Sequence, residues 1–141
     1  MKKIPNWEIA FDEFLEKHIN TPFQWGKWDC IIFTNEFVKA ITKESVLPKS
    51  WTWKNEMEAL KKIDKYGKGK GLVAGIENAI KKTTGIKEVK PAFIRKGDFG
   101  VYKEQSELCC MFDGLNALGV DKDGIVVKDN INVLKAWRID G

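Results

Sequence analysis

The sequence contains a single histidine, His18, and only three cysteines, Cys30, Cys109 and Cys110. An odd number of cysteines excludes a framework in which every cysteine is paired in a disulfide. Cys109 and Cys110 are neighbours, so their side chains point to opposite faces if this segment is a strand. We therefore expect free thiols in a reducing compartment, with one histidine at most to serve any of them as a base.

Long apolar runs are also missing, and none approaches the length that a membrane-spanning helix needs. Two lysines stand near the N-terminus, but Pro5, Asn6 and Glu8 interrupt any apolar segment of the kind that a signal peptide contains. We expect no membrane association and no signal peptide, so that the protein stays in the cytoplasm or leaves it by packaging or lysis. The 141 residues predict a single domain, residues 1–141, with an ordinary buried core.

Acidic residues are scarce in one part of the chain. Residues 60–90 hold nine lysines against Asp64, Glu77 and Glu88, whereas the net charge of the whole chain is +4. Such a basic segment can contact nucleic acid or an anionic cell-wall polymer. Only Tyr66 interleaves the lysines, which argues against nucleic acid, whose bases stack on aromatic side chains. We interpret the lysines as a solvated helix face.

Apolar residues at helical spacing predict two helices at the start of the chain. The first spans residues 7–18, with Asn6 as its N-cap. A loop with Pro22 and Gly26 separates it from the second helix, which Asp29 caps. The second helix would bury one stripe of side chains, namely Cys30, Phe33, Thr34, Phe37, Val38 and Ile41.

Two more helices are predicted before the pattern changes. The third begins near Thr52 and stops at Gly67, and the fourth follows it and is closed by Gly85. Short β-branched or aromatic segments then alternate with turns, at residues 86–94, 97–104, 108–113, 124–129 and 132–139. Helices over about residues 1–85, followed by strands over about residues 86–141, indicate an α+β domain with an antiparallel sheet.

Cys30 is the candidate nucleophile, because it opens a helix and directly follows an aspartate. The positive end of a helix dipole and its free amides favour a thiolate at such a place. The alternative is that Cys30 is the first core residue of its helix, since buried free cysteine is common. From the residues alone, the core interpretation is the more frequent one.

The stretch "PFQWGKWDC", the apolar helix after it and "RKGDFGVY" further along resemble the NlpC/P60 superfamily of papain-like cysteine peptidases. The resemblance is strongest to small phage and prophage proteins with an "F-x-W-G-x-x-D-C" opening, a central "GD" strand and a terminal "AWR" strand. Here these elements are Phe23, Trp25, Gly26, Asp29 and Cys30, then Gly97 and Asp98, then Ala136, Trp137 and Arg138. The resemblance implies a papain-like fold, with N-terminal helices packed on a C-terminal antiparallel sheet.

The chain departs from active members of that superfamily at the catalytic base. They carry a histidine at the start of the second strand of the sheet, whereas Leu108 stands at the corresponding place in "LCCMFDG". Leucine cannot accept a proton, and Cys30 without a base loses general acid–base assistance worth about two to four powers of ten. Nor does the next strand, within residues 116–124, offer a clear third member of a triad.

Other arrangements of the same residues remain open. His18 could act on Cys30 in place of the missing base, although a histidine near the end of a helix more often packs or interacts with the helix dipole. A zinc site is disfavoured, because the chain has no C-x-x-C or H-x-x-x-H pair. Cys109 or Cys110 could instead lie opposite Cys30 and form a thiol pair in the degenerate site.

The resemblance and this departure lead to two expected functions. The first is a non-catalytic phage or prophage protein of the bacterial host cytoplasm or the virion, associated with tail assembly, whose degenerate groove binds a virion protein or a peptidoglycan fragment. The second is a cysteine hydrolase, such as a peptidoglycan endopeptidase or another amidase, with Cys30 as its nucleophile. We expect no cofactor, no metal and no nucleic acid for either. The residues expected at the groove are Trp25, Trp28, Asp29, Leu108, Cys109 and Cys110.

Overall fold

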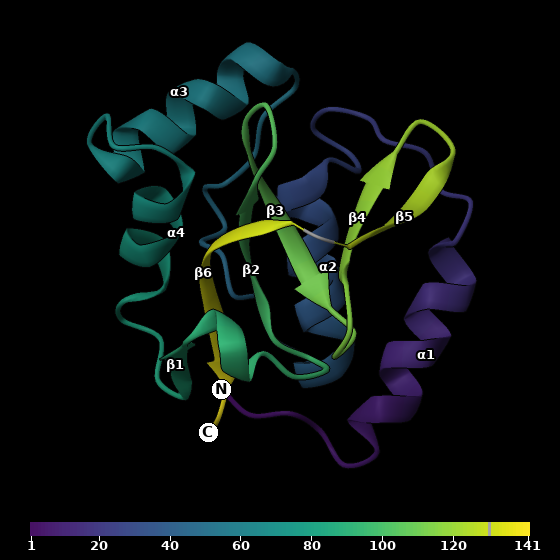
Figure 1. The fold of residues 1–141 in the computed structure, drawn as a ribbon. Coiled ribbons are helices and arrows are strands. Elements are labelled where there is room, and N and C mark those ends of the chain that lie inside the picture. The colour runs from purple at the N-terminus through teal and green to yellow at the C-terminus, as the bar shows by residue number, and fades with distance from the viewer. Residues whose placement is uncertain (130) are drawn as a thin grey trace.

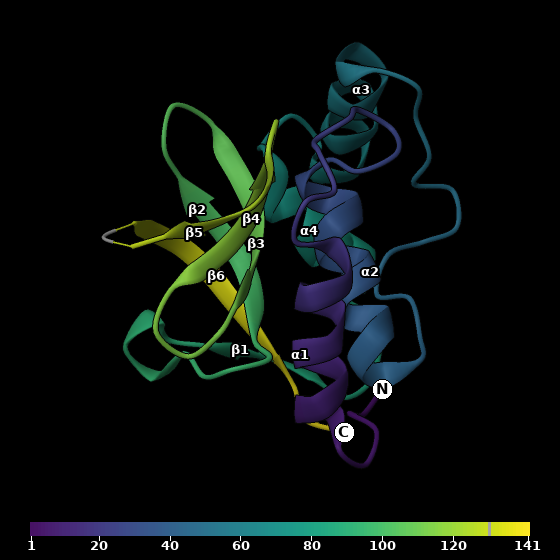
Figure 2. The ribbon, with the colours of Figure 1, turned by 90° about the vertical axis from the view of Figure 1, so that its right-hand side faces the viewer.

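The computed structural model of the protein describes residues 1–129 and 131–141, which form a layer of helices and a layer of strands (Figures 1 and 2). The helices are α1 (Trp7–His18), α2 (Cys30–Thr42), α3 (Glu56–Gly67) and α4 (Leu72–Ile80). The later elements are β1 (Ile86–Val89), the 3-10 helix η1 (Pro91–Phe93), β2 (Phe99–Lys103), β3 (Glu107–Phe112), β4 (Ala117–Asp121), β5 (Gly124–Lys128) and β6 (Asn132–Ile139). These strands form one antiparallel sheet in the order β1-β6-β2-β3-β4-β5, so the predicted α+β class is confirmed.

Helix α2 packs against the inner face of the sheet and supplies much of the core, as its apolar stripe predicts. All six residues of that stripe are buried. Phe33 and Phe37 are completely enclosed, and burying a phenylalanine side chain contributes about 1.5–3 kcal/mol. The strand residues that meet α2 in the same cluster are Phe99, Val101, Cys109, Met111, Leu118 and Trp137.

The outer face of the sheet carries a second, smaller apolar cluster. Its members come from the alternate positions of the same strands, because successive side chains of a strand point to opposite faces. They are Tyr102, Cys110, Phe112, Ala117 and Ala136. Ile94, which directly follows η1, packs against this cluster, so the short helix lies on the side of the sheet away from α1 and α2 (Figure 2).

Strands β3 and β4 separate soon after the turn that joins them. Within the described chain they pair only at Met111 with Leu118 and at Phe112 with Ala117, whereas β4 and β5 pair along their whole length. Figure 1 shows the two strands diverging from their common turn, with α2 behind the opening. The free end of the β4–β5 hairpin is instead bound to the segment after α1, by backbone hydrogen bonds from Ile125 to Ile19 (3.0 Å) and from Phe23 to Asp121 (2.8 Å).

Two predicted helix boundaries are wrong, whereas the bounds of the first helix, residues 7–18, are confirmed. Asn6 precedes α1 as predicted, but its backbone is left-handed and its side chain makes no capping hydrogen bond. Helix α3 begins later than Thr52, because the side chain of Asn55 provides its cap. Gly85 does not close α4 but precedes β1, where its positive φ and lack of a side chain let the backbone of Met1 pass closely.

A buried ion pair joins the start of β2 to the end of β6. Arg138 donates from Nε to Oδ1 of Asp98 at 2.9 Å and from Nη2 to Oδ2 at 2.8 Å, the paired geometry in which arginine binds carboxylates most strongly. Trp137, the residue before Arg138, points into the core. The ion pair is shielded from water, since the side chain of Arg138 is 14% exposed and that of Asp98 is 0% exposed.

None of the helices among the described residues combines the length and the apolar character that crossing a bilayer requires.

Changing Arg138 to alanine should destabilise the fold severely, because it leaves the Asp98 carboxylate buried without its cation. Breaking a buried pair in this way costs about 3–5 kcal/mol, measurable as a fall in the free energy of unfolding in urea. The matched control is Lys87→Ala. Lys87 lies on β1, the strand paired with β6, and this variant removes its exposed ion pair with Asp140. Equal losses in the two variants would contradict the structural role of the buried pair.

Candidate functional site

The carboxylate of Asp29 organises the start of α2. Its Oδ1 accepts hydrogen bonds from the backbone amides of Ile31 (3.1 Å) and Ile32 (3.0 Å), which confirms the predicted N-cap. Its Oδ2 accepts from the amide of Gly26 (3.0 Å) and from the indole Nε1 of Trp53 (2.7 Å). The side chain is 0% exposed, so one carboxylate joins the loop before α2, the first turn of α2 and the loop before α3.

The loop that presents Cys30 is a tight turn held by its own backbone. Gln24 and Trp28 form an antiparallel bridge, with the Trp28 amide donating to the Gln24 carbonyl at 2.8 Å. Gly26 has φ of 81°, and a side chain at this place would collide with the backbone carbonyl of Trp53. Glycine is required here for both reasons, which explains the "WG" of the motif.

The thiol of Cys30 faces the thiol of Cys109. Cys109 lies on the inner face of β3, in the core cluster that contains Cys30. Its interaction with the side chain of Cys30, together with complete burial, raises the pKa of Cys109 well above its usual range. The group opposite the candidate nucleophile is therefore a neutral thiol.

The neighbours of Cys109 along β3 lie elsewhere. Cys110 points to the outer face, where it packs with Tyr102 and Phe112, and does not share a surface with Cys30. Leu108 pairs with Tyr102 in the strand register and packs at the margin of both clusters. The resemblance sets Leu108 at the position of the catalytic base. Because the side chains of β3 alternate between the two faces of the sheet, the residue on the same side as Cys30 is Cys109.

Tyr102 is a further polar group of this region that the sequence did not single out. Burial, the nearby carboxylate of Glu104 and the surrounding thiols raise its pKa above the usual value, so the phenol stays protonated. Its hydroxyl reaches across β3 to the vicinity of Gly119 on β4. No local pattern in the sequence around Tyr102 indicates that the fold would bring it close to the three cysteines.

His18 belongs to a different set of contacts. Its ring stacks on Trp28, with centroids 4.5 Å apart, and its Nδ1 lies 3.3 Å from the hydroxyl of Thr21. Burial and the positive charge of Lys17 lower its pKa. Trp28 packs between His18 and Phe33, and its indole N–H is buried without a hydrogen-bond partner in the described structure. The structure thus uses His18 and Trp28 to pack α1 against α2.

Cys30 and three of the six residues expected to line a groove are enclosed instead. The exposed fractions are 8% for Cys30 and 3% for Cys109, while Asp29 and Cys110 are completely buried. Trp25 is only partly covered and meets Phe23 edge to face at a centroid distance of 5.1 Å. Among the described residues, no group of three or more potential ligand side chains could hold a metal ion.

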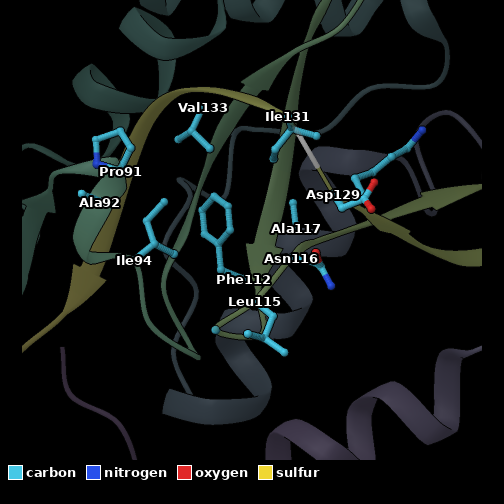
Figure 3. Close-up of a pocket in the computed structure, with 12 residues that line it drawn as sticks. Pro91, Ala92, Ile94, Phe112, Leu115, Asn116, Ala117, Asp129, Ile131 and Val133 are labelled. Carbon is cyan, nitrogen blue, oxygen red and sulfur yellow. The ribbon is translucent and has the colours of Figure 1, made fainter.

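A hollow of about 330 Å³ lies on the outer face of the sheet, away from the paired thiols. Figure 3 shows the ring of Phe112 at its centre, with Ile94 on one side and Ala117 on the other. Pro91, Ala92, Ile131 and Val133 complete its apolar wall, and Leu115 stands at its edge, 91% exposed. This hollow adjoins the outer cluster and has no contact with Cys30 among its lining residues.

Trp53→Phe should destabilise the protein more than Trp51→Phe does. Both indoles are 6% exposed, but only Trp53 donates to the Asp29 carboxylate, whereas the N–H of Trp51 is buried without a partner. The two variants lose the same atoms, so the difference in their free energies of unfolding measures one hydrogen bond to a buried carboxylate, about 1.5–3 kcal/mol. Indistinguishable losses would mean that Asp29 does not depend on Trp53.

Comparisons with known proteins place this architecture in a family without assigning it an activity. No curated protein matches the chain. One family model, described as "Domain of unknown function (DUF6950)", matches residues 2–139 and so covers both the helical layer and the whole sheet. With the Asp29 and Cys30 turn and all six strands inside that match, the chain belongs to the DUF6950 family.

Proposed function

We propose that the protein is a non-catalytic, papain-like protein of NlpC/P60 type that acts by binding, in association with a phage tail or virion. The observation that carries this proposal is that Cys30 faces the neutral thiol of Cys109. A cysteine nucleophile needs a base that takes its proton and later protonates the leaving group. A buried thiol with a raised pKa does neither near neutral pH.

The other polar groups of the region do not supply that base. The phenol of Tyr102 stays protonated because of its burial. Both oxygens of Asp29 already accept two N–H donors each. His18 makes its contacts with Trp28 and Thr21, on the side of α2 that faces α1. Asp29 and His18 therefore have structural partners, and none of these contacts is with the Cys30 sulfur.

The low exposure of the two thiols also argues against hydrolysis by Cys30. Attack on an amide requires its carbonyl carbon to come within about 3–3.5 Å of the sulfur. Cys30 is 8% exposed and Cys109 is 3% exposed, so the pair is covered before any substrate arrives. A partner would instead meet the partly exposed surface around Trp25 and Phe23, which is next to the covered thiols.

The papain-like assignment is supported by how the cysteine is placed. Cys30 opens a helix that packs on an antiparallel sheet, and the strand facing it is the second of the consecutive pair β2 and β3. The "GD" turn at Gly97 and Asp98 leads into β2, and the "AWR" segment lies in β6 beside it. The association with a phage tail or virion, and a peptidoglycan fragment or virion protein as partner, follow from the resemblance of these motifs.

One observation favours the alternative of a cysteine hydrolase. Cys30 stands at the first position of a well-capped helix, a place where the helix dipole favours a thiolate. Hydrolysis by Cys30 would require a local opening that separates it from Cys109 and admits a base. The two functions therefore differ in the state of the Cys30 thiol in the folded protein.

The pH dependence of Cys30 alkylation distinguishes the two functions. Iodoacetamide labelling of the native protein, resolved by peptide mass spectrometry, should give a midpoint at or above the free-thiol value of about 8.5. A midpoint several pH units lower would support the hydrolase. Cys109→His is the informative variant, because an imidazole opposite Cys30 should move the midpoint downward. Leu108→His is its matched control and should leave the midpoint nearly unchanged.

Incubation with purified peptidoglycan tests activity and binding together. We expect the sacculi to retain the protein on sedimentation, and Trp25→Ala to weaken that retention. We expect no more released fragments than Cys30→Ala gives. Fragments that appear with the native protein and vanish with Cys30→Ala would overturn the non-catalytic proposal. If the sacculi retain nothing, a virion protein is the partner, and the chain should then be detected in purified particles by mass spectrometry.

A further inference from the structure

The three cysteines form one pair and one isolated thiol. Cys30 and Cys109 belong to the inner core cluster, where the side chains of α2 and β3 pack together, whereas Cys110 belongs to the outer cluster. The pair joins two elements that are distant in the sequence, the first residue of α2 and the middle of β3. Nothing in the proposed binding function requires two thiols at this place.

We infer that Cys30 and Cys109 form an oxidisable dithiol, which a peroxide converts into an intramolecular disulfide between α2 and β3. This inference goes beyond the proposed binding function and does not depend on any partner. A disulfide needs its two sulfurs to approach to about 2.05 Å, and the packing of α2 on β3 places both cysteines in one cluster of the core.

The chemistry balances with hydrogen peroxide as the oxidant. The Cys30 thiolate attacks one peroxide oxygen, the O–O bond breaks, and a sulfenic acid and water are formed. The Cys109 sulfur then attacks the sulfur of that sulfenic acid and passes its proton to the departing oxygen, so that the S–O bond breaks and a second water leaves. In sum, two thiols and one peroxide give one disulfide and two waters, and the two electrons pass from sulfur to oxygen.

The surroundings decide which sulfur reacts first. Cys30 is the more exposed of the two, at 8% against 3%, so peroxide reaches its sulfur first. Cys109 keeps its proton, since its contact with Cys30 and its burial raise its pKa. Cys30 is therefore the attacking thiol and Cys109 the resolving one. Cys110 is 0% exposed on the other face and takes no part.

The structure leaves room for the two sulfurs to close. At its Cys109 end β3 has no partner on the β4 side, because within the described strands that pairing stops at Met111 and Leu118. A small hollow of about 10 Å³ lies beside Cys109, between Ile31, Thr34 and Phe99. On its other side β3 pairs with β2, where Cys109 lies opposite Val101, so only the side toward β4 is free for an adjustment.

The disulfide would tie the two layers of the fold together. It would close the loop of residues 30–109, and a bond across so long a loop restricts the unfolded chain strongly. We expect the melting temperature to rise by about 5–10 °C on oxidation and to return on reduction.

The test starts from the fully reduced native protein. After treatment with hydrogen peroxide and alkylation, mass spectrometry without reductant should find the Cys30 and Cys109 peptides linked, and two of the three thiols lost. Dithiothreitol should restore both thiols. A Cys109–Cys110 bond, a bond between two chains, or three thiols still free at peroxide concentrations that oxidise glutathione would each overturn the inference.

Two alanine variants separate the pair from the third thiol. Cys110→Ala should still form the disulfide and still show the rise in melting temperature. Cys109→Ala should lose both, and its Cys30 should be trapped as a sulfenic acid by dimedone. Loss of the disulfide in Cys110→Ala would contradict the assignment of the pair. If Cys109→Ala fails to fold, the linked peptides of the native protein and of Cys110→Ala decide the matter.

Discussion

The arrangement at the start of α2 depends on one buried carboxylate. Asp29 accepts four N–H groups from three separate parts of the chain, and burying a charge is tolerated only where such donors replace water. Its donors fix the turn at Gly26, the first turn of α2 and the indole of Trp53 in one position relative to each other. The position of the Cys30 sulfur follows from these bonds. The motif before the cysteine therefore has a structural role, which is to fix the turn and the start of α2, and this role does not depend on the chemistry of the sulfur.

What that sulfur can do is decided by the opposite strand. A cysteine and a histidine in the same places would form an ion pair that activates the thiol. Here the side chain beside Cys30 is Cys109, whose raised pKa keeps it protonated, and both the proposed binding role and the proposed oxidation start from this difference. A change of one side chain on β3 thus alters the class of chemistry while the fold and the cap at Asp29 stay the same. Binding through the neighbouring aromatic surface is compatible with either redox state.

Local patterns were sufficient for part of the fold and of the site. The apolar period of α2, the cap at Asp29 and the change from helices to strands are encoded within a few residues, and the structure confirms each of them. That Cys109 and Cys110 face opposite ways also follows from the strand period. Which of the two meets Cys30 depends on the phase of a strand relative to a helix, and a shift of one residue reverses the answer. The bond from Trp53 joins residues 24 positions apart and has no local signal.

The short pairing between β3 and β4 has a consequence for how the molecule opens. The β4–β5 hairpin is joined to the rest of the sheet by Met111 and Phe112 of β3, but its far end is held by Ile19 and Phe23. In native-state fluctuations, segments that share their hydrogen bonds open together as one cooperative unit. By this rule the hairpin and the segment preceding "WGKWDC" open together. Leu118 of the hairpin lies in the same core cluster as Cys30 and Cys109, so such an opening would also uncover the part of the core that holds the two thiols.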